Sequence, residues 1–210
     1  MKVVKNEKGS AAIYLLWLTT VMIVLTVIIV NIARVYAVKQ QSSTAAQLGA
    51  FAATSEILFV TEEVIKEFDD VMAETHGAGY EPLWNIIEKH QENLMANDYS
   101  EQEAYIKALN EILPVSFSDP VLKDLFDLRF QNNPMISTSI YDTVRQVIRE
   151  NGGNDEHLEI FISPERYRVE VKTDATFDSI ADGEMMKKFS KDIPQKGYGP
   201  ELSYLKYILN

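Results

Sequence analysis

The sequence predicts an α+β protein: a single N-terminal transmembrane helix continues into a long helical stalk, followed by a small helix-rich head with a C-terminal antiparallel hairpin or small sheet. An uncharged run rich in Leu, Ile, Val and Ala extends from Gly9 to Ala33, and no proline follows it until Pro82. Near residue 151 the spacing of apolar residues changes from helical to alternating. We expect four parts: a cytoplasmic tail at 1–8, a transmembrane helix at 9–33, a helical stalk at 34–75 and an extracytoplasmic domain at 80–210.

The apolar run is long enough to cross a bilayer, because a spanning helix needs about 20 apolar residues. A secretory signal peptide is the first alternative, but its apolar core has only about 7–15 residues, whereas this one extends from Ala11 to Val30. A buried core helix is the second alternative, and it would carry a polar stripe. This run offers only Thr19, Thr20 and Thr26. The sequence therefore predicts a retained membrane anchor.

Charge predicts the orientation of the anchor. Lys2, Lys5 and Lys8 precede the span, whereas Arg34 and Lys39 follow it, and cytoplasmic ends of spans are enriched in Lys and Arg. We therefore expect the N-terminus in the cytoplasm and the C-terminal domain outside, in a single-pass cell-membrane protein.

The outer part is strongly acidic. From residue 40 on there are 15 Lys and Arg against 30 Asp and Glu, because five of the 20 basic and one of the 31 acidic residues come earlier. This charge argues against nucleic acid or an anionic membrane surface as the partner of the head, since both attract basic patches. The chain has no cysteine, which excludes disulfides, thiolate zinc sites and cysteine nucleophiles. Burial of an apolar core must hold the head together.

The stalk has two segments of different character. Residues 40–54 read QQSSTAAQLGAFAAT and are mostly small, so another helix could approach them closely; a plain spacer is the alternative. Farther along, an apolar stripe at helical spacing should pack on the head, because an apolar face in water needs a cover. The members of this stripe are Ile57, Val60, Val64, Phe68 and Val71.

The segment from His76 to Gly79 should end the stalk, since glycine favours helix ends. Ser100 and Glu103 form a capping-box pattern, and we expect a break from Pro114 to Pro120. The helices expected in the head are Pro82–Ala96, Ser100–Leu113, Val121–Phe130 and Ser137–Glu150.

Alternating residues follow the turn at residues 151–154. Leu158, Ile160 and Ile162 alternate with polar or outward positions, and the same pattern resumes after Pro164-Glu165 through residues 167–172. This pattern predicts a hairpin. Because an isolated hairpin is marginally stable, we expect further strands at Thr173–Ile180 and Glu201–Leu209.

No residue set predicts catalysis. His76, His90 and His157 lie far apart and lack metal-ligand spacing. The carboxylate pairs Asp69-Asp70 and Asp155-Glu156 are expected by chance in so acidic a chain. Neither a phosphate-binding glycine loop nor a G-x-S-x-G motif occurs in the sequence. We therefore predict neither an enzyme nor a bound cofactor.

The order of features at the N-terminus resembles that of TadE/TadG-like proteins of the Tad (Flp) pilus-assembly system. Such proteins have a short basic tail ending in glycine, an apolar span, an exit with an R-x-Y pattern followed by Gln, and an alanine-rich helix. The matching residues here are Gly9, Arg34, Tyr36, Gln40, Gln41, Ala45, Ala46, Ala50, Ala52 and Ala53.

The resemblance implies particular partners and a processing site. Pilin-like members are cut after the glycine by prepilin peptidase, here between Gly9 and Ser10. The fifth residue after the cut is usually glutamate, whereas this chain has Tyr14. The implied partners are the lipid bilayer, other pilin-like or pilus-assembly membrane subunits, and the peptidase. The residues implied at the membrane exit and in helix packing are Arg34, Tyr36, Gln40, Ala45, Ala46, Gly49, Ala50 and Ala53.

Three functions are compatible with these observations. The first is a structural or accessory subunit of a Tad/Flp-type pilus-assembly or secretion system, similar to a minor pilin or pseudopilin. The second is a single-pass anchored binding or sensor module, which needs a separate signalling partner because the tail is too short to hold a domain. The third is an anchored enzyme, for which the sequence offers no site. We predict the first.

Overall fold

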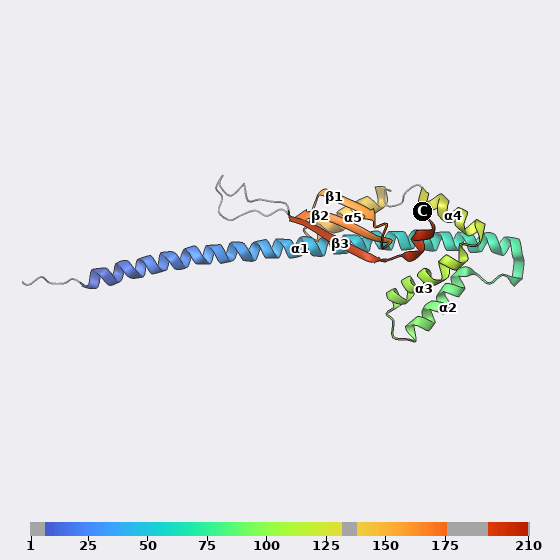
Figure 1. Cartoon of the computed structure of the whole chain (residues 1–210), viewed down its shortest axis with the longest axis horizontal. Helices are drawn as coiled ribbons and strands as arrows, with labels where there is room; N and C mark the ends of the chain where they lie inside the picture. The colour runs from blue at the N-terminus through green and yellow to red at the C-terminus, as the bar shows by residue number, and fades with distance from the viewer. Residues whose placement is uncertain (1–6, 132–137, 176–192, 210) are drawn as a thin grey trace, which may run out of the picture.

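The computed structural model describes residues 7–131, 138–175 and 193–209. The protein is α+β, as predicted, and its main feature is a single long helix that projects alone in its first half and is packed into the head in its second half (Figure 1). The elements in chain order are α1 (Glu7–His76), η1 (Gly77–Gly79), α2 (Leu83–Met95), α3 (Glu101–Ser116), α4 (Pro120–Gln131), α5 (Thr138–Glu150), β1 (Asn154–Ile162), β2 (Arg168–Ala175), β3 (Ile193–Glu201) and η3 (Ser203–Tyr207).

Helix α1 is continuous over 70 residues. It has no internal proline, so every peptide group can join the hydrogen-bond ladder from the apolar run to the head. It ends at His76, where Gly77 adopts a positive φ of 67° that terminates the helix. The predicted continuation of the span into a long helix, and its end, are both confirmed.

The sheet has three antiparallel strands in the order β1-β2-β3. The predicted hairpin is present, with Ile160 opposite Val171 and Ile162 opposite Val169. The expected strand at Glu201–Leu209 is wrong. The third strand is Ile193–Glu201, and Ser203–Tyr207 is a 3₁₀ helix whose Tyr204 and Leu205 are buried. Of the expected strand at Thr173–Ile180, β2 includes residues up to 175, and the remainder lies outside the described residues.

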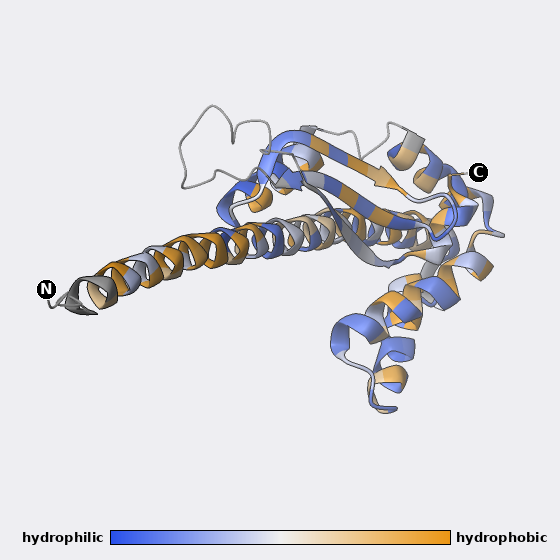
Figure 2. Ribbon diagram, turned by 60° about the vertical axis from the view of Figure 1, so that its left-hand side comes forward, coloured by the Kyte–Doolittle hydropathy of each residue, from blue (hydrophilic) through white to orange (hydrophobic). Residues whose placement is uncertain are grey.

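Helices α2 and α3 form an antiparallel hairpin that projects from the head (Figures 1 and 2). The predicted capping box of α3 is present, since Ser100 accepts from the Glu103 N–H at 3.4 Å and the Glu103 carboxylate accepts from the Ser100 N–H at 3.2 Å. The expected break from Pro114 to Pro120 is present but shorter than predicted, because α3 continues to Ser116 and α4 begins at Pro120. A proline in the last turn removes only one hydrogen bond, and the Phe117 N–H still donates to the Leu113 carbonyl at 3.0 Å.

The core of the head forms around the second half of α1. In the predicted apolar stripe Ile57, Val64 and Phe68 are buried and Val60 is half-buried. Val71 is instead 40 % exposed, and Met72 packs against the core. Residues four apart lie on the same face of a helix, so the buried stripe continues from Phe68 to Met72 and not to Val71. The largest fully buried side chains on the other elements are Ile87, Leu109, Leu113, Leu122, Phe126, Ile148, Leu202, Tyr204 and Leu205.

Candidate functional site

The projecting half of α1 is apolar on every side from Ala11 to Val30 (Figure 2). Within the described residues, α1 is the one helix long and apolar enough to cross a membrane, and none of its most apolar window is buried in the chain. Its three threonines do not break the apolar surface. The hydroxyls of Thr19, Thr20 and Thr26 each donate to the carbonyl four residues earlier, at 2.8, 2.9 and 2.8 Å. With these three hydroxyls satisfied within the helix, the apolar run is suited to a lipid environment.

The predicted processing and exit residues lie along this projecting half. Gly9 and Ser10 belong to the first turns of α1. Arg34, Tyr36 and Gln40 are exposed where the helix leaves the apolar run. The structure does not bring these five residues together into one site, because they are spread along one straight element.

The small residues of α1 lie in an interface within the chain. Ala45, Ala46, Ala50 and Ala53 are fully buried, and the elements that cover this part of α1 are β3 and α5 (Figure 1). A Cβ added at Gly49 would lie 3.2 Å from Val144 and 3.3 Å from Ile148 of α5. The small residues of α1 therefore allow another element to pack closely, as their composition predicted, and the elements that do so are β3 and α5 of the same chain.

Strand β3 contacts α1 through its backbone. A Cβ at Gly197 would overlap the Ala46 carbonyl, and a Cβ at Gly199 would overlap the Thr54 hydroxyl. The amide of Gln47 donates to the Tyr198 carbonyl at 2.5 Å and accepts from the Tyr198 N–H at 3.1 Å. The Gln47 side chain of α1 thus pairs with both backbone hydrogen-bonding groups of Tyr198 in the edge strand β3.

The opposite face of α1 is apolar and uncovered. Leu48 is 38 % exposed, Phe51 47 % and Phe59 57 %, and Ser55 between them is also exposed. These four residues recur at steps of three or four, which is helical spacing. Sequence reasoning missed this face because it followed the small residues and the later stripe. The spacing of 48, 51, 55 and 59 could have revealed it.

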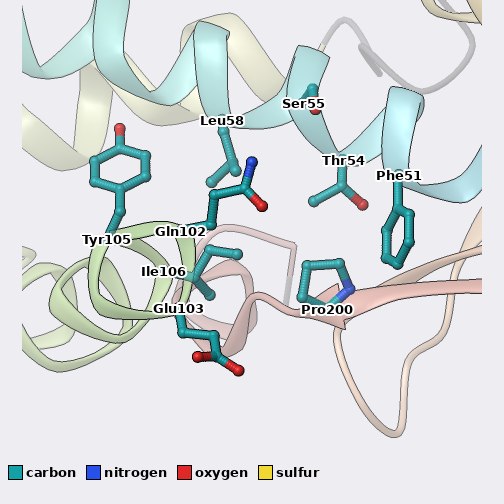
Figure 3. Close-up of a pocket in the computed structure, with 9 residues that line it drawn as sticks. All are labelled: Phe51, Thr54, Ser55, Leu58, Gln102, Glu103, Tyr105, Ile106 and Pro200. Carbon is teal, nitrogen blue, oxygen red and sulfur yellow. The ribbon is translucent and has the colours of Figure 1, made fainter. Parts of the chain in front are cut away.

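A groove of about 490 Å³ lies beside this face, between α1, α3 and the end of β3 (Figure 3). Tyr105 is one of its lining residues, and the Tyr105 hydroxyl is buried and has no hydrogen-bond partner among the described residues. Burial raises the pKa of Tyr105, and the nearby Glu62 charge adds to this effect, so the phenol stays neutral. The lining residues are Phe51, Thr54, Ser55, Leu58, Gln102, Glu103, Tyr105, Ile106 and Pro200.

The histidines noted in the sequence are far apart in the structure. His90 contacts Glu111 at 2.6 Å, linking α2 to α3, and His157 contacts Asp174 at 3.0 Å, linking β1 to β2. His76 is exposed at the end of α1. Over residues 7–131, 138–175 and 193–209, no group of three or more His, Cys, Asp or Glu is arranged to hold a metal ion.

Asp69, one of the carboxylates noted in the sequence, has structural partners. Asp69 of α1 accepts hydrogen bonds from the Tyr80 hydroxyl at 2.6 Å and from the backbone N–H groups of Leu83 and Trp84 at 2.7 and 2.9 Å. It therefore caps the N-terminus of α2 from another helix, where Pro82 supplies no side-chain cap. Burial, together with the hydrogen bond to Asp69, raises the pKa of Tyr80.

Comparison with protein families gives a match at the N-terminus. Residues 9–56 match the family model described as "Putative Flp pilus-assembly TadE/G-like". The comparisons with curated proteins and with solved structures gave no match. The matched segment begins at Gly9 and contains both the exposed span and the small residues on which β3 and α5 pack. The N-terminal segment of this chain is thus similar to TadE/G-like Flp pilus-assembly proteins, which confirms the resemblance seen in the sequence.

Proposed function

We propose that this protein is a membrane-anchored structural or accessory subunit of a Tad/Flp-type pilus-assembly or secretion system, similar to a minor pilin or pseudopilin. The family match at residues 9–56 is the observation that carries the proposal. The matched segment has two physical roles in this chain. Its first part has the exposed apolar surface of a membrane span, and its second part is the helix on which the head folds.

The proposed role is structural and non-enzymatic. The first half of α1 lies in the bilayer with its N-terminus in the cytoplasm, and the head at residues 80–210 lies outside together with the stalk segment that it covers. The chain binds other pilus-assembly membrane subunits through exposed side chains of α1, including Arg34, Tyr36 and Gln40 at the membrane exit. TadE/G-like proteins are typically non-enzymatic pilus-assembly components, and we extend this to the whole chain, which needs no cofactor.

Processing by prepilin peptidase is part of this proposal. Cleavage after Gly9 leaves Ser10 as the first residue and Tyr14 as the fifth. A tyrosine at the edge of a span is suited to the headgroup region, so Tyr14 acts as an interfacial anchor where pilin-like proteins usually have a carboxylate.

The first test is the intact mass and N-terminal sequence of the protein from membranes of its own host. A start at Ser10 is expected, and Gly9→Val should restore the full-length mass. Deletion of the gene should abolish or strongly reduce Tad-dependent piliation or secretion. Unchanged piliation and secretion after deletion would contradict the assembly role. A start at Met1 would contradict only the proposed processing.

Orientation has its own test, because a chain without cysteine accepts single cysteines as labels. Glu88→Cys on the exposed surface of α2 should react with a membrane-impermeant maleimide in intact cells. Asn6→Cys, combined with Gly9→Val so that the tail is retained, is the matched control and should react only after the cells are opened. The reverse pattern would show that the head is cytoplasmic.

A further inference from the structure

One uncharged line of residues follows the exposed side of α1 from the apolar run into the head. Each of its members is exposed, and they are separated by three, four or seven residues, which keeps them on one side of a helix. The line ends at Glu62, which is paired with Lys66 at 2.5 Å. From the end of the span upward the line consists of Ala33, Ala37, Thr44, Leu48, Phe51, Ser55 and Phe59.

Lipid cannot cover the upper part of this line when the apolar run spans the bilayer. At about 1.5 Å per residue, Phe59 lies about 40 Å farther along the helix than Ala33. The groove beside Phe51 extends the apolar surface onto Ile106 and Pro200 (Figure 3). An exposed, uncharged surface that carries the large apolar side chains of Leu48, Phe51 and Phe59 marks an interaction site.

The span itself indicates which partner fits. Ala12, Thr19 and Thr26 precede Ala33 at steps of seven, and all are exposed. Small residues at this period allow a second helix to approach along the same side in lipid. Because α1 is unbroken, the side used in the span and the side exposed beside the head belong to one straight surface.

The bilayer also sets the register between two copies. Two identical spans settle at the same depth, because each places the same apolar residues in the hydrocarbon layer. Residue i of one copy then faces residue i of the other, so Leu48 and Phe59 meet their own counterparts. A parallel twofold pair of this kind uses the same patch on both chains, and an apolar patch without charges is complementary to itself.

We propose that this chain forms a parallel, unstaggered homodimer in the membrane through the line from Ala12 to Phe59. The groove between α1 and α3 receives an aromatic side chain of the second copy. The inference deepens the proposed function and rests on its membrane anchoring. It places the dimer interface on the side of α1 opposite the small residues that β3 and α5 cover.

Cysteine cross-linking of the full chain in membranes tests the proposal. Ala37→Cys and Ser55→Cys on the line should each give disulfide-linked homodimers under mild oxidation. Two separate control variants should remain monomeric. Lys39→Cys lies about 200° around the helix from Ala37, and Glu88→Cys lies on α2. Absence of dimers at Ala37 and Ser55, or equal dimers at all four positions, would overturn the proposal.

Two further measurements fix the register and the surface. Val30 lies four residues after Thr26, on the same side of the helix, and is exposed. Differently tagged Ser55→Cys and Val30→Cys chains should not cross-link to each other, and a heterodimer would show staggered packing and overturn the proposal. Phe51→Asp with Phe59→Asp should lower the yield at Ala37→Cys at least several-fold. Val115 is 74 % exposed elsewhere on the head, so Val115→Asp should leave the cross-linking yield unchanged. If Val115→Asp lowered the yield as much as the two phenylalanine substitutions do, the proposal would also be overturned.

Membrane fractionation separates this proposal from the function on which it rests. A chain found outside the membrane fraction would contradict the anchored subunit itself. A chain that is anchored but monomeric at Ala37 and Ser55 would overturn the dimer and leave the anchored subunit intact.

Discussion

Gly197 and Gly199 set how closely the sheet approaches α1. At both positions the missing side chain makes room for an atom of α1, the Ala46 carbonyl in one case and the Thr54 hydroxyl in the other. The close approach also lets Gln47 reach the backbone of Tyr198 from the helix. Glycine is unfavourable in the interior of a strand, but these two glycines allow β3 to pack directly on α1.

Gly197→Ala should destabilise the head by at least about 2 kcal/mol, in the range of overpacking substitutions. A Cβ there meets backbone of α1, which cannot rotate away. Gly79→Ala is the matched control, since a Cβ at Gly79 has no neighbour within 4 Å. Urea denaturation of the full chain in detergent, followed by tryptophan fluorescence, gives both values. Equal stability of the two variants would show that β3 does not depend on this contact.

At the scale of elements, the junction of α5 and β1 is held by charge. Arg145 and Arg149, in the last turns of α5, contact the Asp155 carboxylate of β1 at 2.5 and 2.7 Å. Hydrogen bonds from Arg145 and then Arg149 lower the pKa of Asp155 to about 2. The carboxylate that the sequence suggested only as a chance acid therefore joins a helix to the sheet.

The stabilisation from Asp155 should depend on pH in one direction. Its pKa in the folded chain is below the ordinary value of 3.8, so the contribution is fully present above pH 3.8 and is lost as the pH falls toward about 2. Asp155→Asn should therefore lower the urea midpoint at pH 7, and its difference from the natural chain should shrink between pH 3.8 and about 2.

Glu156→Gln is the control for this titration, because Glu156 is an exposed neighbour on the same strand. It should leave the midpoint close to that of the natural chain at each pH. A difference between Asp155→Asn and the natural chain that stays constant from pH 7 to pH 2 would show that the two arginines do not act through the Asp155 charge.

At the scale of the whole molecule, one helix is adapted to two environments. Its first half exposes apolar side chains on every side, whereas its second half has a buried face, an apolar exposed face and acidic residues near its end (Figure 2). Hydrocarbon can cover only the first half. The first buried residue of α1 is Ser42, and the head begins there along the helix.

Charges in the middle of the span should prevent stable anchoring. Val24→Asp with Ile28→Asp adds about 2.5–3.5 kcal/mol per residue to the free energy of insertion. The double variant should leave the membrane fraction or be degraded, whereas Val24→Leu with Ile28→Leu should fractionate like the natural chain. Carbonate extraction followed by immunoblotting measures this. Full retention of the aspartate variant would argue that another part of the chain holds it at the membrane.

The sequence alone was sufficient for features that depend on neighbours along the chain. The span, the end of α1 at His76, the capping box of Ser100 and the hairpin around Pro164 each follow from local spacing or local backbone preference. The resemblance to TadE/TadG-like proteins also lies in one continuous segment, and the family match covers that segment.

Only the tertiary structure decided the features that depend on distant residues. The strand at Ile193–Glu201 contains prolines and glycines, which are unfavourable in a strand pattern. It pairs with β2, and its glycines allow it to pack on a helix about 150 residues earlier in the chain. The small face of α1 is likewise defined by β3 and α5, which cover it and leave Leu48, Phe51 and Phe59 exposed. Composition identified α1 as a packing helix, but which of its faces is free depends on contacts between segments far apart in the sequence.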